Sequence, residues 1–353
     1  MSNTTRIPEL DELFRQWSGI LPLKSVPLPE SGSSRIYRRL SGNRKIVVGV
    51  FNPEVKENDA FIYLSKHFHD AGIPVPQVLL VNTAHTAYIQ EDLGDITLFG
   101  LLRSENKPLT VNHPLTRTLE KIIRWLPLIQ TRGHEKLDYS ICYPRKEFDR
   151  QSMLWDLNYF KYNFLKLVAF RFDEQALEDD IQQLVEFLNQ APRSFFLYRD
   201  FQSANIMIRE DEPWFIDFQG GRMGFPAYDL ASLLFDAKAR LSDSVRDHLY
   251  KLYVNEIVAI AGLRKSQLEL YYPGFLIIRM LQALGAFGFR GLIEKKEEFL
   301  RSIPPAMDNL EWITQHLYPG ITLPELWRIL RELPGSRGIN QIRQRLINKP
   351  LPT

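Results

Sequence analysis

The spacing of apolar positions divides the chain into a strand-rich amino-terminal part and a mostly helical remainder. Apolar residues recur at helical intervals over residues 10–17 and over residues 55–69, and Gly72 and Pro74 stop the second helix. Short apolar runs bounded by turn residues predict four strands, at residues 35–40, 46–51, 78–81 and 86–90. A small antiparallel sheet with one accompanying helix is therefore expected near the amino end.

The segment Glu91-Asp92-Leu93-Gly94 separates this sheet from a chain that stays mostly helical to its end. We place a lobe boundary there, so that residues 1–92 form a small lobe with the sheet and residues 93–353 a larger helical lobe, an α+β fold. The most apolar stretch, residues 271–292, contains two arginines and several glycines. These residues favour a buried helix over a membrane span.

Composition describes a globular protein with a sizeable core, because 44% of its 353 residues are hydrophobic and 24% are charged. The net charge of +2 gives no overall field that would select nucleic acid or an anionic membrane, so a small-molecule partner is expected. The single cysteine, Cys142, excludes an internal disulfide and fits a reducing compartment. Residues 1–6 are polar and carry no secretory signal, which makes the cytoplasm the expected location.

Residues 198–217 contain three polar side chains at the spacing of a kinase catalytic loop and the metal-binding strand that follows it, namely Asp200, Asn205 and Asp217. Phosphoryl transfer asks little covalent chemistry of a protein, but it needs a positioned hydroxyl, a bound metal triphosphate and compensation of charge. Asp200 would accept the proton of the attacking hydroxyl. Asn205 and Asp217 would hold the Mg²⁺ that bridges the phosphates of ATP.

The chain between these residues predicts a hairpin that brings Asn205 and Asp217 together at one end. The residues after Asn205 predict a strand, residues 211–213 a turn and residues 214–216 the returning strand. Asp and Asn are also common in ordinary turns, and one Asp-x4-Asn match proves little on its own. The apolar run 195–197 before the loop, and the Phe-Gln-Gly after Asp217 where protein kinases have Phe-Gly, favour the kinase interpretation.

This segment resembles the catalytic region of the aminoglycoside phosphotransferase and choline kinase superfamily, whose fold is similar to that of protein kinases. Residues 224–234 agree, because they resemble the Tyr-Asp-Leu-Ala helix that follows the metal-binding Asp in that family. Asp229 would then support the catalytic loop, whereas by residue type alone it is an ordinary acid in the first turn of a helix. Phe-Gln-Ser after Asp200 and Asp-Phe-Gln from Asp217 resemble the bacterial N-acetylmuramate and N-acetylglucosamine anomeric kinases.

The resemblance implies ATP as phosphate donor, Mg²⁺ as cofactor and an N-acetylated amino sugar as acceptor, phosphorylated at its anomeric hydroxyl. Choline, homoserine and aminoglycoside kinases are the alternatives. They would need an acidic or aromatic pocket for a cation, and the placement of acids such as Asp156 and Asp236 cannot be read from the sequence. A non-catalytic, nucleotide-binding pseudokinase is a further alternative, although binding alone would not need the proposed base, Asp200.

A loop of small residues precedes the first predicted hairpin, where a nucleotide-binding kinase folds such a turn over the phosphates. Its members are Ser31, Gly32, Ser33 and Ser34, followed by the cation Arg35. Free N–H groups in such a loop form an anion nest, and small side chains let the phosphates approach. The same residue types also describe any flexible turn, and Arg35 by itself could be a solvent-facing strand residue.

The lobe junction is the expected site of the nucleotide base. There the backbone of Glu91 and Leu93 could offer N–H and C=O groups to adenine, so that the side chains of the linker hardly matter. Apolar walls would come from Val48, Val78 and Ile216, which are equally good core residues.

Two positions depart from the family pattern. The strand 46–51 lacks the lysine that binds phosphate in protein kinases and antibiotic phosphotransferases, and Lys45 and Lys56 lie on either side of it. This absence favours the sugar kinases and also permits a pseudokinase. Glu57 would be the usual partner of that lysine and is otherwise an acid at the start of a helix. Tyr198 stands where the family has a histidine that supports the loop, so the chemistry should survive.

Candidates for acceptor binding come from two segments. Gln151, Trp155 and Tyr159 lie at i, i+4 and i+8 on one face of a predicted helix, where aromatic and amide groups suit a sugar. Trp and Tyr at this spacing are also common in cores. Gln202 and Gln219 lie beside the proposed base and metal ligand, and their amides could bind an N-acetyl group.

Overall fold

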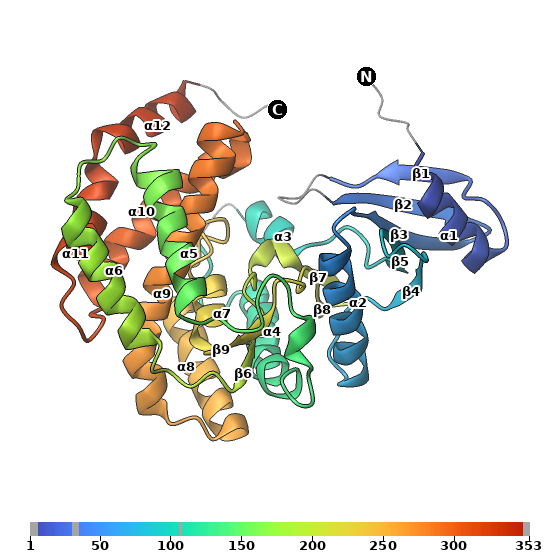
Figure 1. The fold of residues 1–353 in the computed structure, drawn as a ribbon, viewed down its shortest axis with the longest axis horizontal. Helices are drawn as coiled ribbons and strands as arrows, with labels where there is room; N and C mark the ends of the chain where they lie inside the picture. Colours follow the sequence, from blue (N-terminus) through green and yellow to red (C-terminus); the bar gives the residue numbers. More distant parts are fainter. Residues whose placement is uncertain (1–5, 30–34, 106–107, 349–353) are drawn as a thin grey trace.

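The structure is a computed structural model that describes residues 6–29, 35–105 and 108–348. Within these ranges the amino-terminal part is a five-stranded sheet with two helices, and the remainder is mostly helical (Figure 1). The elements of the first part are α1 (Pro8–Ser18), β1 (Lys24–Pro27), β2 (Ile36–Gly42), β3 (Lys45–Phe51), α2 (Val55–Asp70), β4 (Val78–Val81) and β5 (Ala87–Glu91). This arrangement confirms the α+β class.

The strands and helices expected in this part are confirmed, each within two residues of its expected ends. The strand order is β1-β2-β3-β5-β4, and all neighbouring strands are antiparallel. The edge strand β1 has no apolar alternation and ends in Pro27, which cannot donate a ladder hydrogen bond. These properties explain why the sequence pattern did not predict it.

The two faces of the sheet are covered by different helices because alternate side chains of a strand point in opposite directions. On one face an apolar cluster joins Leu10 and Phe14 of α1 to Leu40, Val47 and Ile89. This packing of α1 needs a small residue in β3. A Cβ atom at Gly49 would lie 3.1 Å from the Leu10 side chain.

The other face packs against α2 and belongs to the main core. Phe61 of α2 stacks on Tyr88 of β5 at a ring distance of 5.2 Å and on Phe218 at 4.8 Å. Phe218 directly follows Asp217, so α2 links the sheet to the catalytic segment. Burying these aromatic rings on one helix is expected to fix its position.

Residues 92–97 lead from the sheet to the helical part, and the lobe boundary that we placed after residue 92 falls in this linker and stays a prediction. The remaining main elements are α3 (Leu98–Ser104), α4 (Pro114–Arg132), α5 (Arg150–Phe160), α6 (Glu174–Leu188), β6 (Phe195–Leu197), β7 (Ile206–Arg209), β8 (Glu212–Phe215), β9 (Arg222–Gly224), α7 (Ala227–Leu234), α8 (Asp243–Ala261), α9 (Lys265–Phe287), α10 (Glu297–His316), α11 (Pro324–Glu332) and α12 (Arg337–Ile347). Short turns of other helix types complete the chain: η1 (Tyr139–Ile141), η2 (Lys161–Leu165), η3 (Ser203–Asn205), η4 (Gly288–Ile293) and η5 (Leu333–Gly335).

Helix α9 and its continuation η4 form the helical stretch Lys265–Ile293. Among the described residues it is the one helix long and apolar enough to cross a membrane, with a mean hydropathy of 1.4. In the structure 61% of its most apolar 18-residue segment is buried, and α9 packs against α5, α7 and α10. This is the placement expected of a core helix.

Strands β7 and β8 form the hairpin that carries the catalytic segment, with Ile206 opposite Phe215 and Arg209 opposite Glu212. The turn was expected at residues 211–213, but the structure places it at Glu210 and Asp211. Both residues have positive φ angles, of 53° and 61°, as a two-residue turn of type I′ requires. The expected position was wrong because proline marks turns in general, whereas here it lies within β8.

Candidate active site

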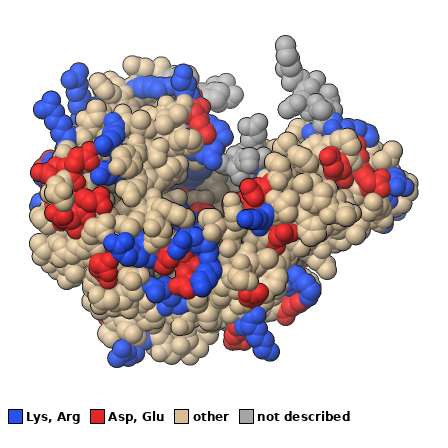
Figure 2. Space-filling view, viewed as in Figure 1, with Lys and Arg blue, Asp and Glu red and all other residues tan. Residues whose placement is uncertain are grey.

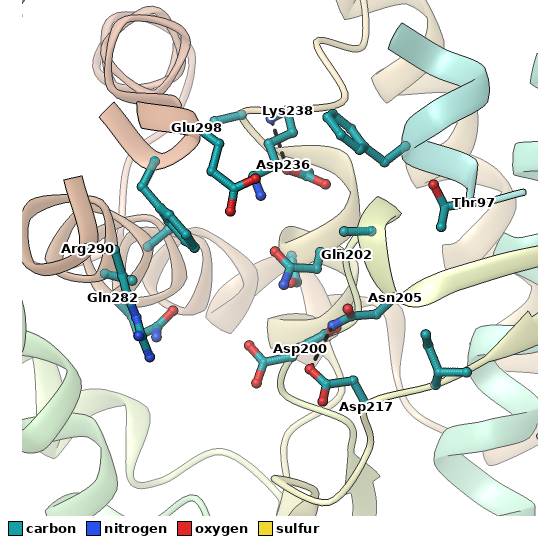
Figure 3. Close-up of a pocket in the computed structure, with 18 of the residues that line it drawn as sticks. Thr97, Asp200, Gln202, Asn205, Asp217, Asp236, Lys238, Gln282, Arg290 and Glu298 are labelled. Atoms are coloured by element: carbon teal, nitrogen blue, oxygen red, sulfur yellow. Dashed lines mark hydrogen bonds between the residues drawn. The ribbon is translucent and has the colours of Figure 1, made fainter. Parts of the chain in front are cut away.

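Asp200, Asn205 and Asp217 come together at the end of the β7–β8 hairpin (Figure 3). The Asn205 side chain donates through Nδ2 to the backbone oxygen of Asp200 at 2.9 Å and to Oδ2 of Asp217 at 3.3 Å. The backbone N–H of Ile216 donates to the carbonyl of Asn205, which extends the hairpin ladder to the site. The local chain therefore brings the proposed base and both proposed metal ligands to one place.

Asp229 anchors the catalytic loop from the first turn of α7. Its two carboxylate oxygens accept the backbone N–H groups of Tyr198 and Arg199, both at 2.8 Å, and one also accepts Gln130 Nε2 at 3.1 Å. Burial raises the pKa of Asp229 to about 7, although these three donors act against the rise. The Tyr198 hydroxyl donates to the carbonyl of Ile216 at 2.6 Å, so this residue ties the loop to the hairpin.

Asp217 has the environment of a carboxylate built to face a cation. Its side chain is 38% exposed toward the cleft, yet desolvation raises its pKa, and the charge of Asp200 adds to the rise. Its φ angle of +66° is uncommon for a residue with a Cβ atom, and such strain concentrates at functional sites. Two crowded carboxylates and the amide of Asn205 fit a hard divalent cation, which takes oxygen ligands.

Arg35 is a buried cation beside Asp217, whereas residues 46–51 of strand β3 contain no cation and the first residue of that strand is Lys45. Its side chain is 1% exposed, and its guanidinium lies 3.0 Å from the Glu57 carboxylate of α2 and 3.7 Å from Asp217. A solvent-facing role for Arg35 is therefore wrong. Lys45 lies elsewhere, with its ammonium 4.8 Å from the Trp17 ring and bonded to the Trp17 carbonyl.

A cavity of about 640 Å³ opens beside these residues, between the sheet and the helical part. Figure 2 shows the hollow, with acidic and basic side chains interspersed over this face of the molecule. The cavity runs from Tyr37, Tyr88 and Gln90 of the sheet, past Asp200 and Asp217, to helices α9 and α10. One end can therefore take a nucleotide while the other takes an acceptor.

A model of the phosphotransferase enzyme family matches residues 25–263 of the chain. The chain belongs to that family. The match spans the sheet, the catalytic loop and α7, and it makes the protein a small-molecule kinase.

Two curated relatives of this phosphotransferase are N-acetylmuramate/N-acetylglucosamine kinases. The protein from Neisseria meningitidis serogroup B is 24% identical over 274 residues, which cover 75% of this chain and 77% of that protein. The protein from Pseudomonas aeruginosa is 25% identical over 235 residues, which cover 65% of each protein.

Solved structures share the protein-kinase-like fold of this phosphotransferase. Plasmodium vivax ethanolamine kinase superimposes with a TM-score of 0.57 at 14% identity, covering 81% of each chain. A spectinomycin phosphotransferase in complex with ADP and spectinomycin gives a TM-score of 0.55 at 14% identity, covering 92% of this chain and 98% of that one. These likenesses confirm the expected two-part kinase-like architecture.

The residues predicted to surround the nucleotide are only partly brought together by the fold. Ser31, Gly32, Ser33 and Ser34 lie outside the described residues. Ile216 lines the cavity, whereas Val48 and Val78 are absent from the described lining and pack in the sheet. In place of those valines, the cavity has Tyr37, Tyr88 and Gln90, of which the two tyrosines were not singled out from the sequence.

The linker after β5 is hydrogen-bonded to the sheet. The backbone N–H of Glu91 donates to the carbonyl of Gln77, while the N–H of Leu93 has no hydrogen-bond partner within the described chain. Arg39 holds Asp92 through hydrogen bonds of 2.6 Å and 3.0 Å, which keeps the linker close to the sheet. Of the two predicted hinge residues, Leu93 therefore keeps its N–H available and Glu91 does not.

The predicted acceptor residues divide into two groups. Gln202 and Gln219 both line the main cavity, and Gln219 donates through Nε2 to Asp217 at 2.8 Å. Its Oε1 atom is buried without a hydrogen-bond partner in the described structure, so it can accept from a ligand. Trp155 lines a second cavity of about 260 Å³, which also reaches Asp200 and Gln219. The structure places Gln151 on the exposed side of α5.

Tyr159, the last residue of the predicted aromatic face, is half-buried and packs against α9 and η4. Its ring lies 6.4 Å from that of Phe289, and a Cβ atom at Gly285 would lie 2.7 Å from Tyr159. Neither Tyr159 nor Gln151 is among the residues that line the two described cavities. The face predicted from helical spacing thus does not form one sugar-binding surface.

The two acids whose placement the sequence left open support the site. Asp156 pairs with Arg199 at 2.7 Å behind the catalytic loop. Asp236 accepts the backbone N–H and the hydroxyl of Ser203 at 3.0 Å and 2.5 Å, and the backbone N–H of Lys238 at 2.9 Å. Both carboxylates are therefore engaged with the protein.

The acceptor end of the cavity is formed by residues that the sequence gave no reason to group. They come from the segment after α7 and from α9, η4 and α10, and they are Arg279 together with Asp236, Lys238, Gln282, Arg290 and Glu298, the five that Figure 3 labels. The two arginines within an otherwise apolar stretch were the available signal. They served only to argue against a membrane span.

Proposed function

We propose that this phosphotransferase transfers the γ-phosphate of ATP to the anomeric hydroxyl of an N-acetylated amino sugar. The observation that carries the proposal is the convergence of Asp200, Asn205 and Asp217 on one cavity, with the guanidinium of the Arg35–Glu57 ion pair 3.7 Å from Asp217. This set supplies a base, oxygen ligands and a cation, which are the parts that phosphoryl transfer requires. The names of the two curated relatives support the acceptor.

In the proposed mechanism Asp200 accepts the proton of the sugar hydroxyl as the hydroxyl attacks the phosphorus. Asn205 and Asp217 would hold Mg²⁺, which when bound neutralises the charge of the phosphates. Arg35 lies where its guanidinium can reach the phosphates while Glu57 fixes its orientation. Asp229 keeps the catalytic loop in place through the Tyr198 and Arg199 backbone.

For the nucleotide we propose binding between the two parts of the chain, with residues 1–92 as the nucleotide lobe and residues 93–353 as the catalytic and acceptor lobe. The free N–H of Leu93 would donate to the base, and the carbonyl of Glu91 would accept from it. Gln90 adds a buried Oε1 atom without a hydrogen-bond partner in the described structure. The small residues 31–34 would cover the phosphates.

A choline or aminoglycoside kinase is the main alternative, and the charges at the acceptor end argue against it. A cationic acceptor would need carboxylates or open aromatic faces. Asp236 is already used by Ser203 and Lys238, and the ammonium of Lys238 lies over the rings of Phe99 and Phe299 at 5.7 Å and 5.0 Å. We expect the enzyme to work in the cytoplasm, where ATP and reducing conditions coincide with its single cysteine.

The proposal is tested by offering acceptors one at a time and measuring magnesium-dependent release of ADP. The panel is N-acetylglucosamine, N-acetylmuramate, choline and kanamycin, and phosphorus NMR of the product locates the new phosphate. We expect turnover of the amino sugars alone, with phosphate on the anomeric oxygen. Turnover of choline or kanamycin alone would refute the amino-sugar proposal, and nucleotide binding without turnover would favour a pseudokinase.

A further inference from the structure

Arg279 is a buried cation at the acceptor end of the cavity, and its hydrogen-bond partners are neutral. Its side chain belongs to α9, and the residue is 6% exposed. The guanidinium donates to the Ser232 hydroxyl and to Oε1 of Gln282, both at 2.9 Å, and lies 5.9 Å from the Tyr228 ring. No carboxylate oxygen of the described residues lies within 4.0 Å of a guanidinium nitrogen of Arg279, which is the limit for an ion pair.

Buried arginines at the site differ in their partners. Among the described residues Arg222 donates to the Gly220 carbonyl and has no ion pair, whereas two other buried arginines have a carboxylate. Arg199 lies 2.7 Å from the carboxylate of Asp156, and Arg35 lies 3.0 Å from that of Glu57. A buried charge without a counter-ion is unfavourable, because the protein replaces its hydration only in part. Arg279 therefore has a capacity for an anion that the described residues leave unused.

The other charged groups at this end have partners of their own. Lys238 and Arg290 join Arg279, against the carboxylates of Asp236 and Glu298, and with Glu294, the partner of Arg290, the charges balance. Asp236 is engaged by Ser203 and Lys238, and Arg290 pairs with Glu294 at 3.0 Å. Figure 3 shows Arg290 and Gln282 across the open cavity from Asp200, with Lys238 and Glu298 along another side.

We propose that Arg279 binds a carboxylate carried by the acceptor, and that the preferred acceptor is an amino sugar with an acidic substituent. This inference rests on the proposed amino-sugar kinase function. N-acetylmuramate meets the description, because it differs from N-acetylglucosamine by a lactyl ether that ends in a carboxylate. A guanidinium presents parallel N–H donors that match the two oxygens of such a group. Arg279 then determines specificity, while Asp200 acts on either sugar.

The test compares both sugars with the wild-type enzyme and with Arg279→Gln, which keeps a side-chain donor for Ser232 and removes the charge. We expect kcat/KM for N-acetylmuramate to fall about 10- to 100-fold and kcat/KM for N-acetylglucosamine to change less than about threefold. The methyl ester of N-acetylmuramate has the same shape without the charge, and the wild type should use it poorly. Arg290→Gln tests the other arginine of this end, and its losses should be the same for both sugars, because Glu294 already pairs with Arg290.

Equal losses for both sugars in Arg279→Gln would mean that the residue only braces α9 against α7, and the inference would be wrong. If kcat/KM for N-acetylmuramate fell selectively in Arg290→Gln instead, Arg290 would be the residue that binds the carboxylate, and the inference would be wrong as well. Calorimetric binding of N-acetylmuramate, with ADP and Mg²⁺ present, separates this inference from the proposed function. Binding that depends on Arg279 without any turnover would refute the kinase proposal alone, and absence of N-acetylmuramate binding with turnover of N-acetylglucosamine would refute the inference alone.

Discussion

The guanidinium of Arg35 lies 3.0 Å from the carboxylate of Glu57, and the pair joins the start of β2 to the first turn of α2. The same guanidinium lies 3.7 Å from Asp217. A planar, permanently charged fork can contact two carboxylates at once, which an ammonium group does less well. The pair thus gives a physical account of how the fold can do without a phosphate-binding lysine in residues 46–51 of β3.

If Arg35 serves the phosphates, its replacement should impair the use of ATP. We expect Arg35→Ala to lower kcat/KM for ATP by about 100-fold or more, and Arg35→Lys to lower it about tenfold, because the charge remains but the fork is lost. Steady-state kinetics at saturating acceptor measures both effects. Lys45→Ala is the control and should behave like the wild type, because Lys45 contacts Trp17 away from the cavity. Full activity in Arg35→Ala would contradict the assigned role.

Gln202 should bind the acceptor and leave the nucleotide alone. We expect Gln202→Ala to raise KM for the sugar about tenfold with KM for ATP unchanged, because loss of one neutral hydrogen bond costs about 0.5–1.5 kcal/mol. Gln151→Ala should change neither constant, since Gln151 is exposed and lies outside both described cavities. A larger rise in KM for the sugar in Gln151→Ala than in Gln202→Ala would contradict this assignment and place the acceptor site at α5.

Asp229 should make protein stability depend on pH in an unusual direction. Its pKa is about 7 in the folded protein against an ordinary value of 3.8, so the folded state binds the extra proton between these values. The stability conferred by the protonated form is complete below pH 3.8 and is lost as the pH rises through 7. Relative to Asp229→Asn, the wild type should lose unfolding free energy on the order of 4 kcal/mol across this window.

Urea unfolding of both proteins at several pH values between 4 and 8 measures this difference. Parallel curves for the two proteins would show that Asp229 does not titrate in this range. The same variant should also lose most of its activity. The reason is that an amide in place of the carboxylate points its own N–H donor at the backbone N–H of Tyr198 or of Arg199. One of the two hydrogen bonds that hold the catalytic loop is then lost.

The convergence of the three candidate catalytic residues could be predicted from the sequence because they lie on one short segment. Asp200, Asn205 and Asp217 are joined by a local hairpin, so their spacing fixes their geometry without knowledge of the rest of the fold. The sheet of the first part could be predicted for a similar reason, since its strands alternate and its turns are short. Only β1, exposed and ending in Pro27, gave no signal.

The acceptor end could not be predicted because packing of distant elements creates it. Arg279 and Lys238 meet only when α9 packs against α7 and the segment after it, and periodicity does not say which face of a helix meets a cavity. The same limit explains the aromatic face of α5. Spacing correctly aligned Trp155 and Tyr159, but one lines a side cavity and the other packs against Phe289.

The most direct test of the central claim measures magnesium-dependent ADP release with N-acetylglucosamine for the wild type and for Asp200→Asn. The variant keeps the size of the side chain and removes the base, and we expect kcat to fall about 10²- to 10⁴-fold while ATP affinity by calorimetry stays the same. Glu12→Gln, on the exposed surface of α1, is the control and should retain full activity. Full turnover by Asp200→Asn would contradict the account.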